Sequence, residues 1–180
     1  FDSGGAVWAE GEPGALEFLN VRFIANETYN SGAGVMAQSF AGPLRFEGCH
    51  FDGNNGTYDH GSAIYSAYYT DLTLVDTVVE NHIAAYRGAG VYHYYKGDFL
   101  CQDSLFEDNH SRYSGGGLHI QDLYSDGIAQ IENCQFVGNS AGYEGGGLYV
   151  EDVDSIQLVN SLFQGNESGY LLFHQGKVLK

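Results

Sequence analysis

The segment at residues 136–148 reads FVGNSAGYEGGGL, and the segment at residues 106–118 reads FEDNHSRYSGGGL. Both begin with the pattern Phe-x-x-Asn, and both end in three glycines followed by a leucine. A long pattern that recurs at a fixed distance indicates an internal repeat.

The first half of this pattern occurs six times along the chain. The asparagines are 28, 27, 28, 30 and 27 residues apart. The apolar positions are Phe23, Phe51, Val78, Phe106, Phe136 and Phe163, and the paired asparagines are Asn26, Asn54, Asn81, Asn109, Asn139 and Asn166. The second half, a glycine-rich segment before an aliphatic residue, occurs at 4–7, 32–35, 61–64, 88–91, 115–118 and 145–148.

A period of about 28 residues is typical of a solenoid, a propeller or an array. Segments such as 44–46 and 156–158 alternate apolar and polar residues, which is the period of a strand. No segment shows the apolar stripe of an amphipathic helix, and a propeller blade needs about 40 residues. We therefore predict an all-β parallel β-helix of about six coils, with three short strands per coil, as a single domain over residues 1–180.

Equivalent residues of successive coils are expected to stack about 4.8 Å apart, which is the strand spacing of a sheet. Two inward columns are predicted for the strand after the glycines: Val7, Val35, Ile64, Val91, Leu118 and Leu148, then Ala9, Ala37, Ser66, His93, Ile120 and Val150. The asparagines are expected to form a ladder that hydrogen-bonds to the backbone or to the next amide. The third coil is one residue short between Leu72 and Asn81, so its register is left open.

The two alternating motifs resemble the repeats of the chlamydial polymorphic outer membrane proteins. The resemblance covers about residues 4–170 and implies a right-handed parallel β-helix of the pectin-lyase-like class. It also implies an extracellular or cell-surface location and an adhesive role.

The charge of the chain limits its partners. Its 180 residues include 23 acids and 7 bases, which give a net charge of −16. Such a charge argues against binding to nucleic acid or to an anionic membrane. No apolar run approaches the roughly 20 residues of a membrane-spanning helix, so membrane insertion is not expected.

Two lines of aromatic residues are predicted on the surface. The first points outward from the strand after the glycines and comprises Trp8, Met36, Tyr65, Tyr92, His119 and Tyr149. The second precedes the glycines and comprises Tyr29, Tyr58, Tyr86, Tyr113, Tyr143 and Tyr170. Two interpretations stay open: rings that stack to stabilise neighbouring coils, and a contact face for sugar rings or for another protein.

The sequence suggests no cofactor. The loop acids Asp122, Asp126, Asp152 and Asp154 are weak calcium candidates, but their spacing matches no fixed calcium-binding pattern. Solvated charge is the preferred interpretation of these acids. The histidines show no metal-ligand spacing, so no metal site is predicted.

The three cysteines are expected to be free, buried thiols. Cys49 and Cys134 share a column but lie three coils apart, which is too far for a disulfide. Cys101 belongs to a different column. The four glycosylation sequons begin at Asn26, Asn55, Asn109 and Asn166. Three of them fall on the predicted ladder, which leaves Asn55 as the candidate acceptor.

Catalysis is the alternative function, because β-helices also host polysaccharide lyases and hydrolases. A glycosidase needs paired carboxylates, and Asp52, Glu80 and Glu107 lie on successive coils. The regular repeat offers no long loops to wall a cleft, so no catalytic residue is assigned. A carbohydrate-binding module remains a further alternative.

Neither end of the chain offers a polar cap for the solenoid, and uncapped edges recruit other chains. The chain is therefore expected to be a piece of a longer solenoid or a subunit that stacks end to end. About 6.4 coils predict an axial repeat of about 30 Å per subunit. The sequence thus predicts a non-catalytic extracellular structural or adhesive β-helix that contacts itself, a cell-surface glycan or a protein.

Overall fold

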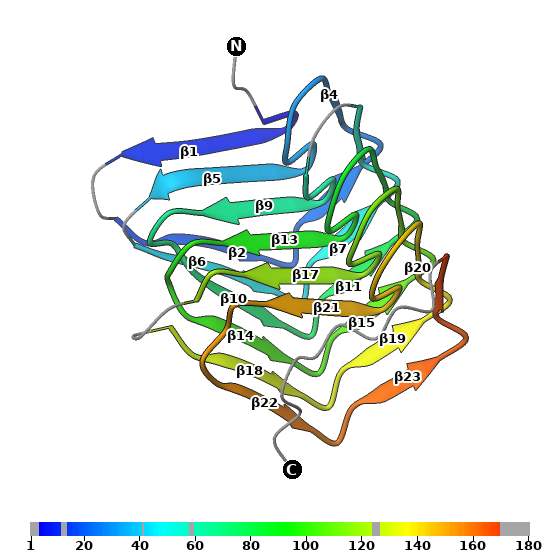
Figure 1. Ribbon diagram of the computed structural model, residues 1–180. Helices are drawn as coiled ribbons and strands as arrows, with labels where there is room; N and C mark the ends of the chain where they lie inside the picture. The colour runs from blue at the N-terminus through cyan, green and yellow to red at the C-terminus, as the bar shows by residue number, and fades with distance from the viewer. Residues whose placement is uncertain (1–3, 12–13, 41, 58–59, 124–126, 170–180) are drawn as a thin grey trace.

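The computed structural model describes residues 4–11, 14–40, 42–57, 60–123 and 127–169. The regular structure of these residues consists of β-strands, and they include no helix long and apolar enough to cross a membrane. Strands of successive coils pair in parallel and form four six-stranded sheets around one core (Figure 1). Seen from the N-terminal end, the chain turns clockwise as it recedes (Figure 1), which is the sense of a right-handed coil. The predicted parallel β-helix is confirmed.

Each coil contributes one strand to every sheet. The first sheet contains β1 (Val7–Gly11), β5 (Val35–Phe40), β9 (Ile64–Ala67), β13 (Val91–Tyr94), β17 (Leu118–Gln121) and β21 (Leu148–Glu151). The second contains β2 (Leu16–Leu19), β6 (Pro43–Glu47), β10 (Asp71–Val75), β14 (Phe99–Gln102), β18 (Ala129–Glu132) and β22 (Ile156–Val159). The third contains β3 (Arg22–Ile24), β7 (His50–Asp52), β11 (Val78–Glu80), β15 (Leu105–Glu107), β19 (Gln135–Val137) and β23 (Leu162–Gln164).

A fourth sheet corrects the prediction of three strands per coil. It contains the two-residue strands β4 (Glu27–Thr28), β8 (Asn55–Gly56), β12 (Ile83–Ala84), β16 (His110–Ser111), β20 (Ser140–Ala141) and β24 (Glu167–Ser168). Two residues are too few to show an alternating pattern, so these strands could not be predicted from the sequence.

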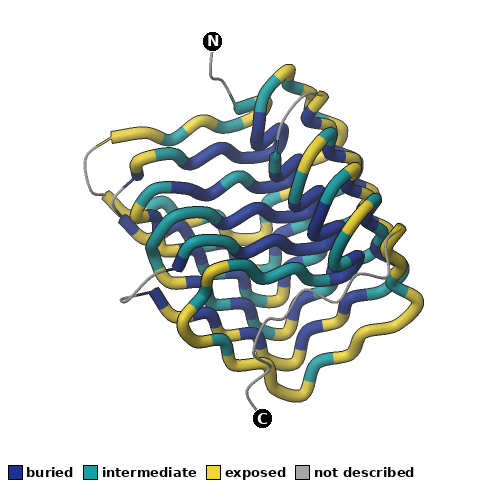
Figure 2. Tube along the Cα trace, in the orientation of Figure 1, coloured by how far each residue is buried: buried dark blue, intermediate teal, exposed yellow. Residues whose placement is uncertain are grey.

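The core is a set of stacked columns, as predicted. In the first sheet Val35, Ile64, Val91 and Leu118 are equivalent in register and fully buried. Along the middle strands of the second and third sheets, buried positions alternate with more exposed ones (Figure 2). In the third sheet the rings of Phe106, Phe136 and Phe163 stack with centroids 4.7 Å apart and interplanar angles of 5° and 3°.

The asparagine ladder is a continuous hydrogen-bond chain. Asn139 Oδ1 accepts from the backbone N–H and from Nδ2 of Asn109, at 3.1 and 2.9 Å. Asn139 Nδ2 donates to the carbonyl of Phe106 at 2.9 Å. The same three bonds link Asn166 to Asn139 and to Phe136. Each amide therefore satisfies backbone groups of the preceding coil, which explains why the position favours asparagine.

The register of the third coil differs from the prediction by one residue. Val79, and not Val78, pairs with Phe51 and Phe106 and is fully buried. The ladder position that follows is therefore His82, and Asn81 is displaced from the ladder. Asn81 instead has a left-handed backbone, with φ of 61°, and donates from Nδ2 to Asp52 Oδ1 at 2.9 Å.

The glycines before the first sheet serve two purposes. Gly88 has φ of 59°, a conformation that costs glycine little. A Cβ at Gly117 would lie 2.7 Å from the carbonyl oxygen of Gly147 in the next coil. The segment therefore needs glycine both for its turn and for close stacking of backbones.

The cysteines are free and buried, as expected. The structure adds one contact that the sequence did not predict. Cys134 Sγ lies 3.4 Å from Cys101 Sγ, although Cys101 lies on β14 and Cys134 lies between β18 and β19 of the next coil. Burial raises the pKa of the Cys101 thiol, so it remains protonated at neutral pH.

Candidate functional site

The first predicted aromatic line is mostly covered. Tyr92 is 4% exposed and His119 is fully buried, whereas Trp8 in the first coil is 50% exposed. The ring of His60, from the turn before the glycines, stacks on Tyr92 with centroids 4.6 Å apart. The prediction of an exposed stripe is therefore wrong at Met36, Tyr92 and His119. At Tyr92 the ring of His60 covers the sheet, and His119 lies between the rings of Tyr92 and Tyr149. Tyr65 and Tyr149 are partly buried.

The second predicted line is a surface stack along the axis. Tyr86, Tyr113 and Tyr143 stack nearly parallel, with centroids 5.2 Å apart at each step. Tyr86 and Tyr143 are each 45% exposed. Tyr29 is exposed in the first coil, and Tyr58 and Tyr170 lie outside the described residues. Ring stacking between coils is thus present here, and the contact role stays a prediction.

A further aromatic cluster lies at the opposite end of the first sheet. Tyr68 and Tyr69 follow β9, and Tyr94 and Tyr95 occupy the end of β13 and the residue after it. The ring centroids of Tyr68 and Tyr94 are 5.5 Å apart, and those of Tyr69 and Tyr95 are 5.8 Å apart. These tyrosines were not predicted from the sequence, although the doublets at 68–69 and 94–95 recur in successive coils.

The two clusters are joined across the sheet. We call the joined rings the aromatic band, and it comprises Tyr86, His60, Tyr92, Tyr94, Tyr68, Tyr95 and Tyr69. Neighbouring rings in the band have centroids 4.6–5.8 Å apart. Each contact adds about 0.5–1.5 kcal/mol beyond the burial of apolar area. The band is therefore a rigid aromatic surface that crosses two coils.

The backbone at the corner end of the band is strained. Tyr68, Tyr69, Tyr95 and Lys96 have φ of 57°, 70°, 60° and 65°. Such angles are unfavourable for bulky side chains and cost about 1–3 kcal/mol each. Asp122, at the same corner of the fifth coil, also has a positive φ, but aspartate tolerates it better. The middle coils therefore keep tyrosine at a position that favours smaller polar residues.

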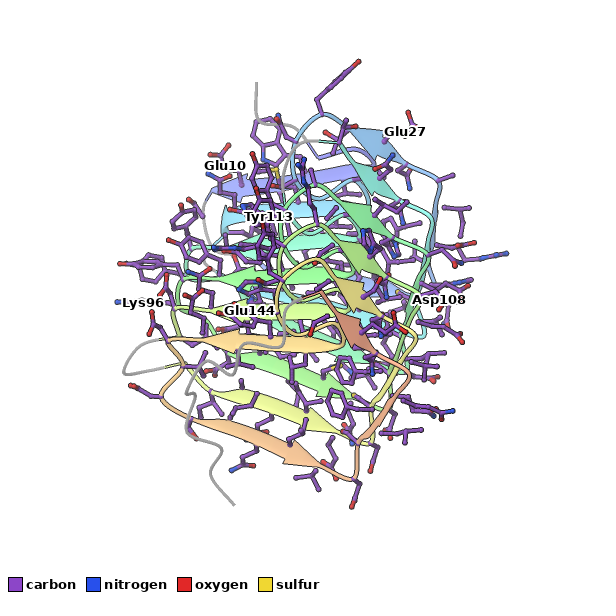
Figure 3. The ribbon with its side chains drawn as sticks, turned by 45° about the vertical axis from the view of Figure 1, so that its right-hand side comes forward. Glu10, Glu27, Lys96, Asp108, Tyr113 and Glu144 are labelled. Atoms are coloured by element: carbon purple, nitrogen blue, oxygen red, sulfur yellow. The ribbon has the colours of Figure 1, made fainter. Side chains whose placement is uncertain are left out.

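A hollow opens beside this end of the band. Its volume is about 270 Å³, and it is lined by Tyr69, Asp71, Lys96, Gly97, Asp98 and Gly127. Lys96 Nζ lies 5.3 Å from the centre of the Tyr69 ring. Figure 3 shows Lys96 projecting from the edge of the molecule, whereas Tyr113 and Glu144 lie nearer the middle of this view. A cation, carboxylates and an exposed ring thus surround one small space.

Two phenols of the first sheet, those of Tyr92 and Tyr149, are neutral at physiological pH. Burial raises the pKa of Tyr149 to about 12 and raises that of Tyr92 as well. The Tyr92 hydroxyl donates to Gln121 Oε1 at 2.8 Å, and Arg87 Nη1 donates to the same oxygen at 3.1 Å. The centre of the aromatic band is consequently a fixed support rather than a titrating group.

The third sheet brings the predicted carboxylates together. Asp52, Glu80 and Glu107 are paired in register on β7, β11 and β15. His50 lies on the same face of β7, two residues before Asp52, and its Nε2 is 2.8 Å from Glu80 Oε1. This grouping of histidine and carboxylates was not predicted from the sequence.

The predicted calcium candidates do not gather in the part of the chain that the structure describes. Asp122, Asp152 and Asp154 belong to no group of three potential ligands there, and Asp126 lies outside it. Asp122 and Asp152 have φ of 61° and 51°, so a structural reason exists for aspartate at these corners.

The glycosylation candidates differ in exposure as expected. Asn55 is exposed, whereas Asn109 is fully buried in the ladder. Asn26 and Asn166 are partly buried, and their amides are hydrogen-bonded within the ladder. Glycosylation at Asn55 stays a prediction.

Comparison with known families agrees with the repeat. Residues 133–151 match the model of the Chlamydia polymorphic membrane protein repeat. These residues include both Phe136-x-x-Asn139 and the glycine segment 145–148. The match covers one of the repeats, and it agrees with the resemblance of the two motifs to the polymorphic membrane protein repeat. The β-solenoid fold fits this repeat, and together they fit a surface β-helix protein. No curated protein and no solved structure matched the chain.

Proposed function

We propose that the chain is a non-catalytic structural and adhesive β-helix at the cell surface or outside the cell, and that the aromatic band contacts a glycan. The observation that carries the proposal is the exposed end of the band, where Tyr69 is 55% exposed beside the hollow with Lys96. Tyrosine rings present an apolar face to a sugar ring and a hydroxyl at its edge. Sites on rigid elements hold such groups in fixed positions.

The dimensions of the hollow favour a single sugar ring. Its volume of about 270 Å³ lies just below the usual range of about 300–1,000 Å³ for pockets that hold drug-sized ligands. Asp71 Oδ1 accepts from the backbone of Asp98, and Asp98 Oδ1 accepts from that of Ile128. These bonds fix two carboxylates that can accept hydroxyl groups, which favours a neutral sugar over an acidic one.

Binding of polysaccharides to the immobilised chain tests this proposal. Biolayer interferometry with galactan, mannan, xylan and polygalacturonate measures the dissociation constants. We expect at least one neutral polysaccharide to bind, and the double variant Tyr69→Ala, Lys96→Ala to bind it at least tenfold more weakly.

Tyr29→Ala is the matched control, because it removes a tyrosine that is 77% exposed but lies outside the band. It should bind within about twofold of the unmodified chain. Absence of binding to every polysaccharide, or equal losses in both variants, would overturn the assignment of a glycan.

A carbohydrate-active enzyme is the second candidate. It is favoured by the row of carboxylates that Asp52, Glu80 and Glu107 form on adjacent strands. These groups lie on the outer face of a regular sheet, which supplies no walls to position a chain for cleavage. We therefore expect neither reducing ends nor unsaturated products from the same polysaccharides. Product formation that is lost in Glu80→Gln would favour the enzyme instead.

A further inference from the structure

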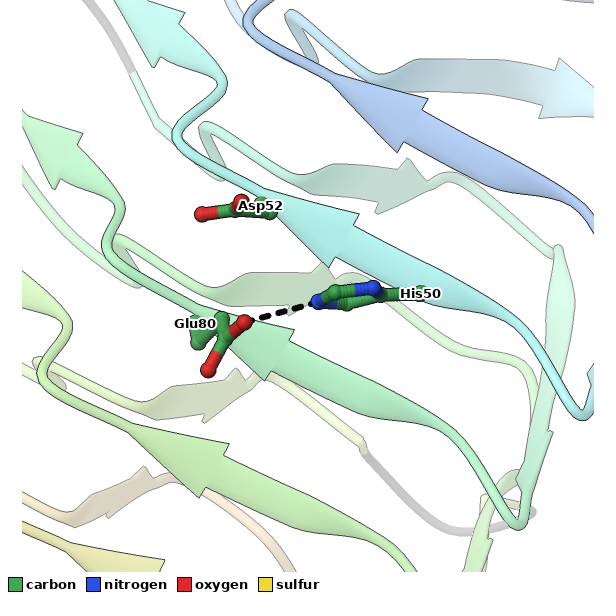
Figure 4. Close-up of side chains that lie close together, drawn as sticks. All are labelled: His50, Asp52 and Glu80. Atoms are coloured by element: carbon green, nitrogen blue, oxygen red, sulfur yellow. Dashed lines mark hydrogen bonds and ion pairs between the residues drawn. The ribbon is translucent and has the colours of Figure 1, made fainter.

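The outer face of the third sheet holds three different donor side chains on two adjacent strands. β7 and β11 pair in parallel, and Asp52 lies directly opposite Glu80. Side chains two residues apart on a strand share a face, so His50 lies beside Asp52. One ligand atom from each of His50, Asp52 and Glu80 lies within 4.8 Å of the other two (Figure 4).

Packing and hydrogen bonds already orient these groups. His50 and Glu80 side chains are only 28% and 25% exposed, and His50 Nε2 is 2.8 Å from Glu80 Oε1. Asn81 donates from Nδ2 to one oxygen of Asp52, at 2.9 Å. Asn81 is present at this point because the third coil is shifted by one residue. A supporting amide of this kind is typical of groups that orient metal ligands.

The charges around the cluster favour a bound cation. Asp52, Glu80 and Glu107 form a file of like charges on neighbouring strands, which destabilises a sheet when nothing neutralises it. Arg22 lies opposite His50 on β3, on the side of β7 away from Glu80. It is therefore not placed between the two facing carboxylates.

We propose that His50, Asp52 and Glu80 bind a divalent transition-metal ion, with Zn²⁺ as the best match. One imidazole nitrogen and two carboxylates form a mixed ligand set that suits zinc, whereas calcium prefers six to eight oxygens. The hydrogen bond between His50 and Glu80 places both ligands where one ion can replace the shared proton. The outer face of the sheet leaves the remaining coordination position to water or to a donor from a partner.

Isothermal titration calorimetry of the full chain with ZnCl₂, after treatment with a chelator, tests the proposal. We expect one ion per chain, and at least tenfold weaker binding in His50→Ala and in Glu80→Gln. In the unmodified chain, zinc should also shift the ¹⁵N resonance of His50 Nε2.

Two controls separate this site from adventitious binding. His110→Ala removes an exposed histidine on a different sheet, and Glu107→Gln removes the next carboxylate in the file. Both should bind zinc within about threefold of the unmodified chain. Circular dichroism checks that each variant is folded. No binding in the folded chain, or equal affinity in His50→Ala, would overturn the proposal.

Discussion

His82 occupies a position that other coils give to asparagine, and its ring is hydrogen-bonded on both sides. Nδ1 lies 2.8 Å from Asn109 Oδ1, which can only accept, so Nδ1 carries the proton. Nε2 lies 3.1 Å from Asn54 Nδ2, which donates, so Nε2 is the acceptor. The ladder therefore continues through a neutral histidine, and a second proton would place two donors against each other.

This arrangement makes stability dependent on pH. Burial lowers the pKa of His82 and of His93 from 6.5 to about 4, and that of His119 to about 3. The unfolded chain binds protons at these residues below about pH 6.5, whereas the folded chain does so only near pH 4 or below. The free energy of unfolding should therefore fall as the pH is lowered through this window.

The variant His82→Asn isolates the contribution of His82 to this pH dependence from the contributions of His93 and His119. Asparagine restores the ladder amide and does not titrate. The variant therefore lacks the loss of unfolding free energy, about 1.4 kcal/mol per pH unit between pH 6 and 4.5, that His82 causes as the pH falls. When the pH is lowered from 7 to 5, we expect the unfolding free energy of the variant to fall by about 2 kcal/mol less than that of the unmodified chain. Urea denaturation at the two pH values measures this change, and an unaltered pH dependence would contradict the neutral assignment.

The sequence predicted the ladder at five positions but not at this one. The repeat spacing fits either Asn81 or His82 as the ladder residue, since both lie 27 or 28 residues from Asn54 and from Asn109. The burial of Val79 decides the register, and that depends on packing against Phe51 and Phe106. Because residues 78 and 79 are both valine, the sequence does not show which of the two side chains points into the core.

At the scale of elements, the stacked phenylalanines are the main apolar support of the third sheet. Phe136 is fully buried between Phe106 and Phe163, whereas Phe163 in the last described coil is 41% exposed. Phe136→Ala should therefore cost about 3–5 kcal/mol of unfolding free energy. Phe163→Ala should cost less than half as much, because fewer contacts are lost.

Denaturation of both variants in guanidinium chloride measures this difference. A solenoid is stabilised by contacts between neighbouring coils, so the inner position should always cost more than the outer one. Equal losses of unfolding free energy in Phe136→Ala and Phe163→Ala would contradict the observed stacking.

The elements were predictable to different degrees. The first sheet and the phenylalanine column follow from the glycine segments and the Phe-x-x-Asn motif. The cover over Tyr92 was not predictable, because it depends on how the turn containing His60 folds back over the strands. The corner tyrosines were visible as doublets, but their strained backbone is a property of the three-dimensional turn.

At the scale of the whole molecule, both ends of the described solenoid expose apolar side chains. Val7, Leu16 and Phe18 are only partly buried in the first coil, although the equivalent Val35, Leu44 and Phe46 of the second coil are fully buried. Leu158 and Phe163 are 48% and 41% exposed in the last described coil. Equivalent core positions in the middle coils are fully buried, as at Ile131 and Phe136. A further coil stacked on each end would bury these residues and pair the strand edges.

Either a continuing solenoid or a second copy can supply such a coil, and we propose that copies of this chain stack end to end where no other coil covers these edges. A contact between two different ends does not close and produces a filament. The charge of −16 opposes association at low ionic strength and is screened by salt.

Electron microscopy of the chain at neutral pH and 0.15 M salt tests this account most directly. Stacked copies predict filaments with an axial repeat of about 30 Å, given a coil spacing of about 4.8 Å. Discrete particles one chain in length at every concentration would contradict end-to-end assembly.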